Sequence, residues 1–210
     1  PAALLASLGS AASEPAHDVP VAPLAALGAG VDPHASFVLA AEPVHLVAGR
    51  EDVAVAGRVD DLSAADARTL VDALNRHFAE DGIAFVTPRP DTWFVTTNAR
   101  PDLVTVPLDT VLGSMMSPHL PTGGAARLWQ RWSTEIQMLL HAHPVNQARA
   151  RLGLAPCNGV WFWGGGQLAD VGLAAPFRVH ASAGRAADLV RGLALASGGE
   201  AMPLPGACEG

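Results

Sequence analysis

The stretch of residues 125–166 constrains the fold of this chain most strongly, because it holds the clearest periodic pattern in the sequence. Within 125–141, apolar residues recur on one stripe at helical spacing, which predicts an amphipathic helix. Pro144 begins a second, shorter helix, and Gly153 stops it. An apolar strand then starts at Val160 and runs into three consecutive glycines. The segment therefore predicts two helices followed by a strand that ends in a glycine-rich turn.

Strand and helix signals alternate through the rest of the chain. A helix is expected to begin after Ser63, a natural N-cap with Asp66 three residues later. A strand at 177–181, a helix at 185–196 and a last strand from Met202 predict a parallel βαβ unit. Further short apolar runs predict strands at residues 36–41, 44–48, 53–56, 83–87 and 93–97. This order of elements indicates an α/β fold.

The composition excludes several classes of function. The net charge is -7, which argues against nucleic-acid binding because such binding needs a dense positive field. The basic residues are all Arg, so the chain offers neither a Schiff-base lysine nor a phosphate-loop lysine. No apolar run is long enough to span a bilayer. Cys157 and Cys208 form no zinc-binding pattern, and we expect free thiols in a cytoplasmic protein without a cofactor.

The region 141–166 has the highest density of polar and aromatic side chains. Asn146 and Arg149 lie three residues apart on the predicted short helix, which places them on one face. Arg149 can hold a phosphate or carboxylate through paired N–H bonds. A glycine-rich turn lets backbone N–H groups approach an anion closely. We therefore predict one concave, partly polar ligand site, formed by His143, Asn146, Arg149, Asn158, Trp163, Gly164, Gly165 and Gly166.

A structural alternative accounts for the same residues. The tryptophans can belong to the core, and the glycines can form a simple loop. Asn146 and Asn158 can cap helix and loop backbone, and Arg149 can pair with an acid. A shared metal ion is not expected, because His141 and His143 are two residues apart and point to different faces of a helix.

Several motifs are more specific than periodicity. The first is His-Pro-Val-Asn at 143–146, followed by Arg149, Gly153, Pro156 and Asn158 and by Trp-Phe-Trp-Gly-Gly-Gly at 161–166. Further motifs lie at 56–58, 74–75, 187–193 and 204–207. Together they resemble the archaeal-type, cofactor-independent phosphoglycerate mutases. The segments 21–24 and 42–46 resemble more closely the bacterial RpfE-type regulatory proteins, and the resemblance covers roughly residues 20 to 207.

The resemblance implies both a fold and a ligand class. The fold would be α/β, with a partial alkaline-phosphatase-like parallel-sheet core and an inserted α+β cap. Residues 1–42 and 159–210 would form the core fragment, and residues 43–158 the inserted cap. The protein would bind a small phosphorylated or carboxylated molecule, with no nucleic-acid or membrane partner, and its oligomeric state is not indicated.

Departures from the family pattern determine the expected chemistry. The active superfamily places metal-binding carboxylates and histidines around a Ser or Thr nucleophile, and neither end of this chain carries such motifs. Ser13 matches the nucleophile segment only weakly, since Ala12 and Glu14 stand where Gly and Asp are expected. We therefore expect a non-catalytic, regulatory relative without a metal site. Two alternatives stay open, namely an active mutase or phosphohydrolase whose metal ligands lie outside this chain, and a protein-interaction module.

Overall fold

The computed structural model describes residues 19–204, apart from 35 and 174, so Ser13 and Cys208 lie outside it. The helices are α2 (Val21–Gly28), α3 (Ala64–His77), α4 (Leu108–Val111), α5 (Ala126–His141), α6 (Pro144–Arg151) and α7 (Arg185–Ala196), with short 3₁₀ turns at Ser117–His119 and Leu168–Asp170. The strands are β1 (Phe37–Ala48), β2 (Val53–Arg58), β3 (Ile83–Arg89), β4 (Thr92–Thr97), β5 (Gly159–Gly166), β6 (Arg178–Ala181) and β7 (Glu200–Pro203).

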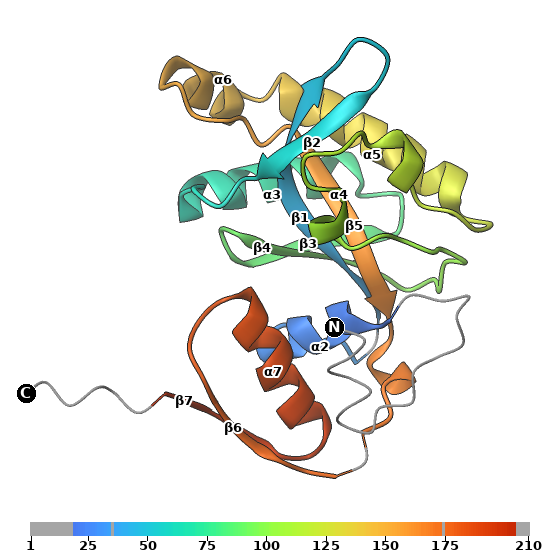
Figure 1. Cartoon of the computed structure of the whole chain (residues 1–210), viewed down its shortest axis with the longest axis vertical. Coiled ribbons are helices and arrows are strands. Elements are labelled where there is room, and N and C mark those ends of the chain that lie inside the picture. The colour runs from blue at the N-terminus through green and yellow to red at the C-terminus, as the bar shows by residue number, and fades with distance from the viewer. Residues whose placement is uncertain (1–18, 35, 174, 205–210) are drawn as a thin grey trace, which may run out of the picture.

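A five-stranded antiparallel sheet lies at the centre of the structure (Figure 1). β1 organises it, because β4 and then β2 pair along one edge of β1 while β5 pairs along the other. β3 extends the sheet beyond β4. The pairing of Val38 with Gly166 and of Val44 with Gly159 keeps β5 beside β1 over most of its length.

The two faces of the sheet bury different sets of side chains, because successive residues of a strand point to opposite faces. Phe37, Leu39 and Ala41 of β1 pack with α3 and α5 in the largest core cluster. Val38 and Ala40 point the other way and pack against α2. Figure 1 shows α3 and α5 on one side of the sheet, with α2 and α7 at its lower end. This second face of β1 carries the candidate site.

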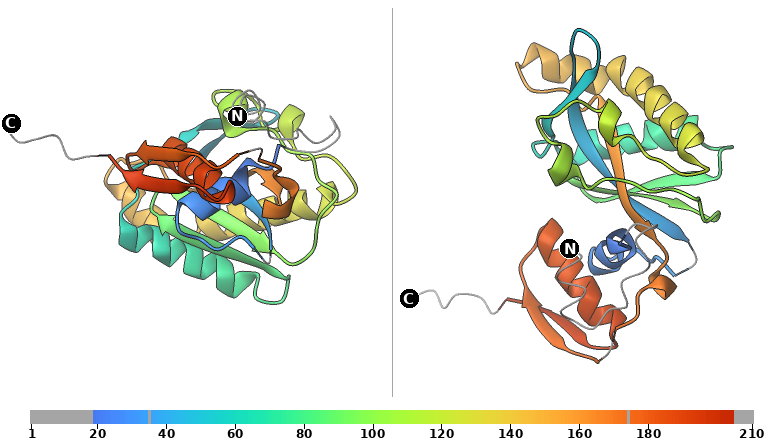
Figure 2. Two further views of the ribbon diagram at one scale, coloured as in Figure 1. Left: turned by 90° about the horizontal axis from the view of Figure 1, so that it is seen from below. Right: turned by 45° about the vertical axis from the view of Figure 1, so that its right-hand side comes forward.

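α2 and α7 cross at very short distance and form a unit with the β6–β7 pair (Figure 2). A Cβ atom on Gly192 of α7 would lie 1.7 Å from the carbonyl oxygen of Leu24, and one on Gly28 of α2 would lie 1.9 Å from that of Asp188. The two helices can therefore approach each other only because both positions are glycine. β6 and β7 are parallel and are joined by α7, so the predicted βαβ unit is confirmed.

The predicted parallel-sheet core is not confirmed, because the main sheet is antiparallel and, among the strands of the described residues, only β6 and β7 pair in parallel. Strand direction follows from long-range pairing, such as that of β1 with β5, which a local pattern does not encode. The predicted division into core and cap has two boundaries. The first, after residue 42, falls inside β1, and the second, after residue 158, falls just before β5. That division stays a prediction.

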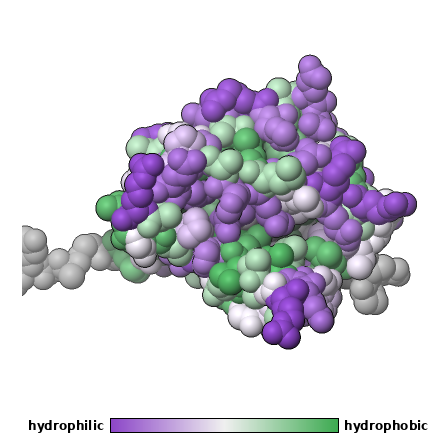
Figure 3. Space-filling model, turned by 90° about the horizontal axis from the view of Figure 1, so that it is seen from above, coloured by the Kyte–Doolittle hydropathy of each residue, from purple (hydrophilic) through white to green (hydrophobic). Residues whose placement is uncertain are grey.

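Two further observations concern the surface of the molecule and the length of its helices. Seen from above, the molecule is largely hydrophilic, with smaller hydrophobic areas between polar side chains (Figure 3). Among residues 19–204 as described, no helix has both the length and the apolar character needed to cross a bilayer.

Candidate ligand-binding site

A cavity of about 630 Å³ lies between the second face of the sheet and α7. Volumes of this size suit a small-molecule ligand. Its apolar wall comes from α2, β1, β4 and β5, and includes Ala22, Ala40, Phe94 and Trp163. Its charged lining residues are Glu42, Arg58, Asp91, Asp109, Arg185 and Asp188. The site thus combines an apolar wall with a set of charged side chains from distant parts of the chain.

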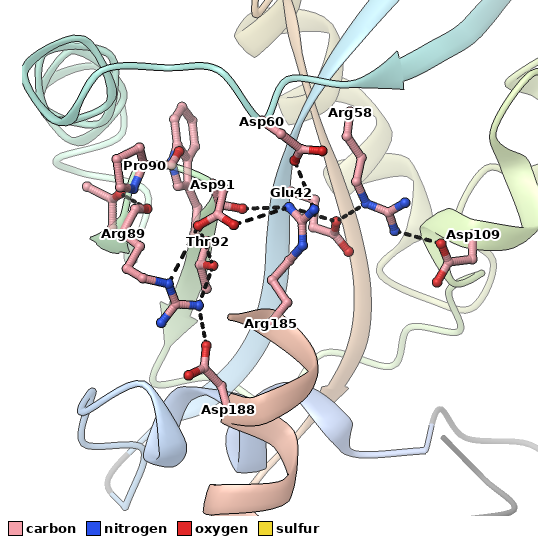
Figure 4. A network of polar contacts seen from close by, with 12 residues as sticks. Glu42, Arg58, Asp60, Arg89, Pro90, Asp91, Thr92, Asp109, Arg185 and Asp188 are labelled. Carbon is pink, nitrogen blue, oxygen red and sulfur yellow. Dashed lines mark hydrogen bonds and ion pairs between the residues drawn. The ribbon is translucent and has the colours of Figure 1, made fainter. Parts of the chain in front are cut away.

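Glu42 is the central polar group of this site. It follows an apolar run in β1 and is only 4% exposed. Its Oε1 accepts a hydrogen bond of 2.6 Å from Nε1 of Trp163. Its Oε2 accepts one of 2.8 Å from Nε of Arg58 and lies 3.9 Å from Nη1 of Arg185. One buried carboxylate therefore brings two guanidinium groups together, one from the end of β2 and one from the start of α7 (Figure 4).

Each arginine also has an outer carboxylate partner. Nη2 of Arg58 lies 2.9 Å from Asp109, whose side chain is 80% exposed. Nη2 of Arg185 lies 2.8 Å from Asp60, and its Nη1 donates to the backbone oxygen of Asp91. Burial by itself lowers the pKa of Arg58, but the hydrogen bonds and charges of Glu42 and Asp109 outweigh it and raise the pKa above its usual value. Arg58 thus stays a cation inside the cavity.

A second charged cluster is centred on Asp188, which also lines the cavity. Asp188 of α7 is fully buried and pairs with Arg89 at the end of β3 and, at 2.6 Å, with Arg191 one turn along the helix. Arg89 also donates to the hydroxyl of Thr92 at 2.8 Å. This cluster fixes α7 against the edge of the sheet and so holds Arg185 in position.

The predicted site residues from the α6 region have structural contacts outside this cavity. His143 caps the start of α6 by accepting from the backbone N–H of Val145 at 3.2 Å, and burial, with the charge of Arg76, lowers its pKa. Asn146 is buried and bonds to the backbone of Leu140 and to both backbone groups of Cys157.

Arg149 and Asn158 also bind backbone. Arg149, which is 4% exposed, pairs with the carboxylate of Asp61 and donates to the carbonyl oxygen of Ala155 at 2.9 Å. Asn158 bonds to both the N–H and the carbonyl oxygen of Leu46. These contacts correspond to the structural alternative, in which the asparagines hold backbone and the arginine pairs with an acid.

The other predicted residues, Trp163 and the glycines at 164–166, lie in the C-terminal half of β5, whereas Asn158 precedes this strand. Trp163 lines the cavity, whereas the glycines continue the strand instead of forming a turn. A Cβ on Gly165 would lie 2.8 Å from the ring of Phe37, and one on Gly166 would lie 2.3 Å from Pro20. The glycines therefore admit close packing of neighbouring segments, and of the predicted set only Trp163 lines the cavity.

Sequence reasoning did not select Glu42, Arg58, Asp109 or Arg185 as site residues. The available signal was a lone acid inside the apolar run of β1, since a buried carboxylate requires a partner. Its partners lie far away along the chain. Among the described residues, no group of three or more His, Cys, Asp or Glu side chains is arranged so that it could hold a metal ion.

Comparison with solved structures defines the class of fold. A cofactor-independent phosphoglycerate mutase from Thermoplasma acidophilum is similar with a TM-score of 0.55 and 16% identity, over 90% of this chain and 52% of that chain. The PH0037 protein from Pyrococcus horikoshii gives a TM-score of 0.54 and 17% identity, over 91% and 44%. The chain therefore has a mixed α/β fold that occurs in cofactor-independent phosphoglycerate mutases.

Sequence comparison points to the same enzymes. The chain is 33% identical over 112 residues to the 2,3-bisphosphoglycerate-independent phosphoglycerate mutase of Methanothrix thermoacetophila, covering 50% of this chain and 27% of that protein. It is 28% identical over 152 residues to a probable mutase of the same kind from Geobacter sulfurreducens, covering 70% and 37%. No family model matches. The chain is thus homologous to these mutases in part, and it spans less than half the length of these curated relatives.

Proposed function

We propose that this chain is a phosphoglycerate-mutase-like protein that binds a small phosphorylated or carboxylated molecule in the cavity beside Glu42. The observation that carries the proposal is the approach of Arg58 and Arg185, from opposite walls, to the same oxygen of Glu42. Paired guanidinium groups are the usual protein groups that bind phosphate and carboxylate. The partial homology to phosphoglycerate mutases supports a ligand of this class.

The arginines can exchange their outer partners for a ligand. Asp109 and Asp60, which bind the outer nitrogens of the two guanidinium groups, have side chains that are 80% and 56% exposed. Ion pairs with such exposed partners contribute at most about 1 kcal/mol, so a phosphate can replace them at small cost. The inner contact of Arg58 with Glu42 is shielded from water and is expected to stay in place.

The proposal includes a non-catalytic and regulatory role in the cytoplasm. Its support is the departure of Ala12 and Glu14 from the nucleophile motif and the resemblance to RpfE-type regulatory proteins. We further propose that the ligand site is centred on Glu42, with Trp163 as the member of the sequence-predicted set that contributes to it. His143, Asn146, Arg149, Asn158 and the glycines at 164–166 then support the surrounding structure.

Calorimetric titration with 3-phosphoglycerate tests the binding proposal. Arg58→Gln and Arg185→Gln should each weaken binding at least about tenfold, the typical loss for a charge-assisted hydrogen bond. Arg131→Gln is the matched control, because Arg131 lies on the exposed side of α5, where it pairs with Glu135. Thermal unfolding of each variant confirms that it is folded during the titration. Unchanged binding in both cavity variants would refute the proposed site.

A turnover assay separates the binding protein from the enzyme alternative. We expect no conversion of 3-phosphoglycerate to 2-phosphoglycerate, with or without added manganese. Turnover that Ser13→Ala abolishes would instead show that the chain is an active mutase.

A further inference from the structure

Asp109 is held at the rim of the cavity by the short helix α4. Its neighbours Leu108 and Val111 are fully buried and anchor this helix in a core cluster with Trp161. The Asp109 side chain itself is 80% exposed, yet it also lines the cavity. The fold thus presents one carboxylate to the cavity from a fixed backbone position.

The two carboxylates that bind Arg58 differ strongly in environment. Glu42 binds Nε at 2.8 Å and its side chain is 6% exposed, whereas Asp109 binds Nη2 at 2.9 Å from the solvent side. The inner contact orients the guanidinium group through Nε, and the outer contact occupies Nη2 (Figure 4). A group entering from solvent therefore meets Asp109 at the position where it would bind Arg58.

We propose that Asp109 is a built-in competitor for the ligand, which must displace the Asp109 carboxylate from Arg58 in order to bind; this inference rests on the proposed function. Asp109 then lowers the affinity for every anion and acts as a specificity-determining residue. A monocarboxylate gains little from the exchange, because one carboxylate replaces another. A phosphate group carries about 1.5 to 2 negative charges at neutral pH and gains more, so the site favours phosphorylated over merely carboxylated molecules.

A double-mutant cycle with glycerol 3-phosphate as the probe tests this role. Dissociation constants are measured by calorimetry at constant pH and ionic strength, because both affect such contacts. Asp109→Asn should bind the probe about two- to fivefold more tightly than the wild type, the range expected for loss of an exposed ion pair. Asp109→Glu retains the competing carboxylate and should bind like the wild type.

The cycle also distinguishes competition at Arg58 from a general charge effect. In an Arg58→Gln background, the further change Asp109→Asn should leave the affinity unchanged, because the guanidinium group for which Asp109 and the ligand compete is absent. Asp72→Asn, on an exposed position of α3 and not among the cavity-lining residues, removes the same charge and should also have no effect. An equal gain with and without Arg58, or from Asp72→Asn, would overturn the inference.

Failure of the inference and failure of the proposed function give different results. If the wild type binds glycerol 3-phosphate but Asp109→Asn does not increase the affinity, the proposed ligand site is retained and Asp109 is not a competitor. If neither the wild type nor Asp109→Asn binds the probe, both the proposed function and the inference are wrong.

Discussion

Trp163 donates a hydrogen bond of 2.6 Å from its indole nitrogen to Glu42, and so joins the cavity end of β5 to the middle of β1. The two strands are already neighbours, with Ala40 opposite Trp163. Because Oε1 of Glu42 binds Trp163 and Oε2 binds Arg58, both oxygens of the buried carboxylate have a partner. A buried charge of this kind is tolerated only when it is so paired.

Glu42→Gln should therefore lower the stability of the protein. The amide keeps one acceptor but turns its NH₂ group toward Trp163 or Arg58, so that two donors face each other. We expect a loss of about 1–3 kcal/mol in the free energy of unfolding, measured by urea denaturation. Glu51→Gln, at an exposed position in the β1–β2 turn, is the matched control and should stay within about 0.5 kcal/mol of the wild type. Equal stability of the two variants would show that Glu42 does not stabilise the fold.

Much of the secondary structure could be predicted because its signals are local. Ser63 caps α3 by accepting from the N–H of Asp66, as its sequence position predicts. The predicted helix at 185–196 coincides with α7. Trp161 and Phe162 of β5 belong to different core clusters, as alternation along a strand requires.

The antiparallel arrangement of the strands in the main sheet and the position of the cavity could not be predicted from local signals. Both depend on contacts between residues far apart in the chain, such as Arg185 with Asp60. The glycines at 164–166 suggested an anion-binding turn, but they permit close packing against Pro20 and Phe37. A glycine needed for close packing and one needed for a ligand look alike in a single sequence.

Arg149→Ala distinguishes a structural arginine from the arginines of the cavity. The substitution removes the hydrogen bond to Ala155 and the ion pair to Asp61, whose side chain is 55% exposed and becomes solvated. We expect a loss of about 1–3 kcal/mol in unfolding free energy. The affinity for 3-phosphoglycerate should stay within about twofold of the wild type. Loss of binding at unchanged stability would restore Arg149 as a ligand-binding residue.

Gly192→Ala tests the close crossing of α2 and α7. The added methyl group would lie 1.7 Å from the carbonyl oxygen of Leu24, so the two helices must move apart. We expect a loss of at least about 2 kcal/mol in unfolding free energy, together with weaker ligand binding, because α7 carries Arg185. Gly57→Ala in β2 is the control, since its added Cβ meets nothing within 4 Å. Equal melting temperatures of the two variants would contradict the crossing.

Cys157 should make the stability depend on pH in alkaline solution. Complete burial raises the pKa of this thiol from 9.0 to about 12, and the nearby charge of Arg149 opposes the rise only in part. Between these two values the unfolded chain loses the thiol proton while the folded chain keeps it. The unfolded state then binds fewer protons, so the free energy of unfolding falls as the pH rises, by up to about 1.4 kcal/mol per pH unit. Below the unfolded pKa this contribution is fully present.

The composition of the chain makes this effect measurable, because the sequence contains no Tyr and no Lys, the other side chains that titrate in this range. The free energy of unfolding of a Cys208→Ser variant can be measured by urea denaturation between about pH 8.5 and 11. It should fall as the pH rises, because most of this range lies above the pKa of the unfolded thiol and below that of the folded one. The same measurement on Cys208→Ser with Cys157→Ala should give a much flatter profile, whatever its absolute stability. Iodoacetamide should likewise modify Cys157 only as fast as the protein unfolds, since the folded thiol is buried and protonated. Rapid modification of the folded protein, or identical pH profiles for the two variants, would show that Cys157 is accessible and ionises like an ordinary thiol.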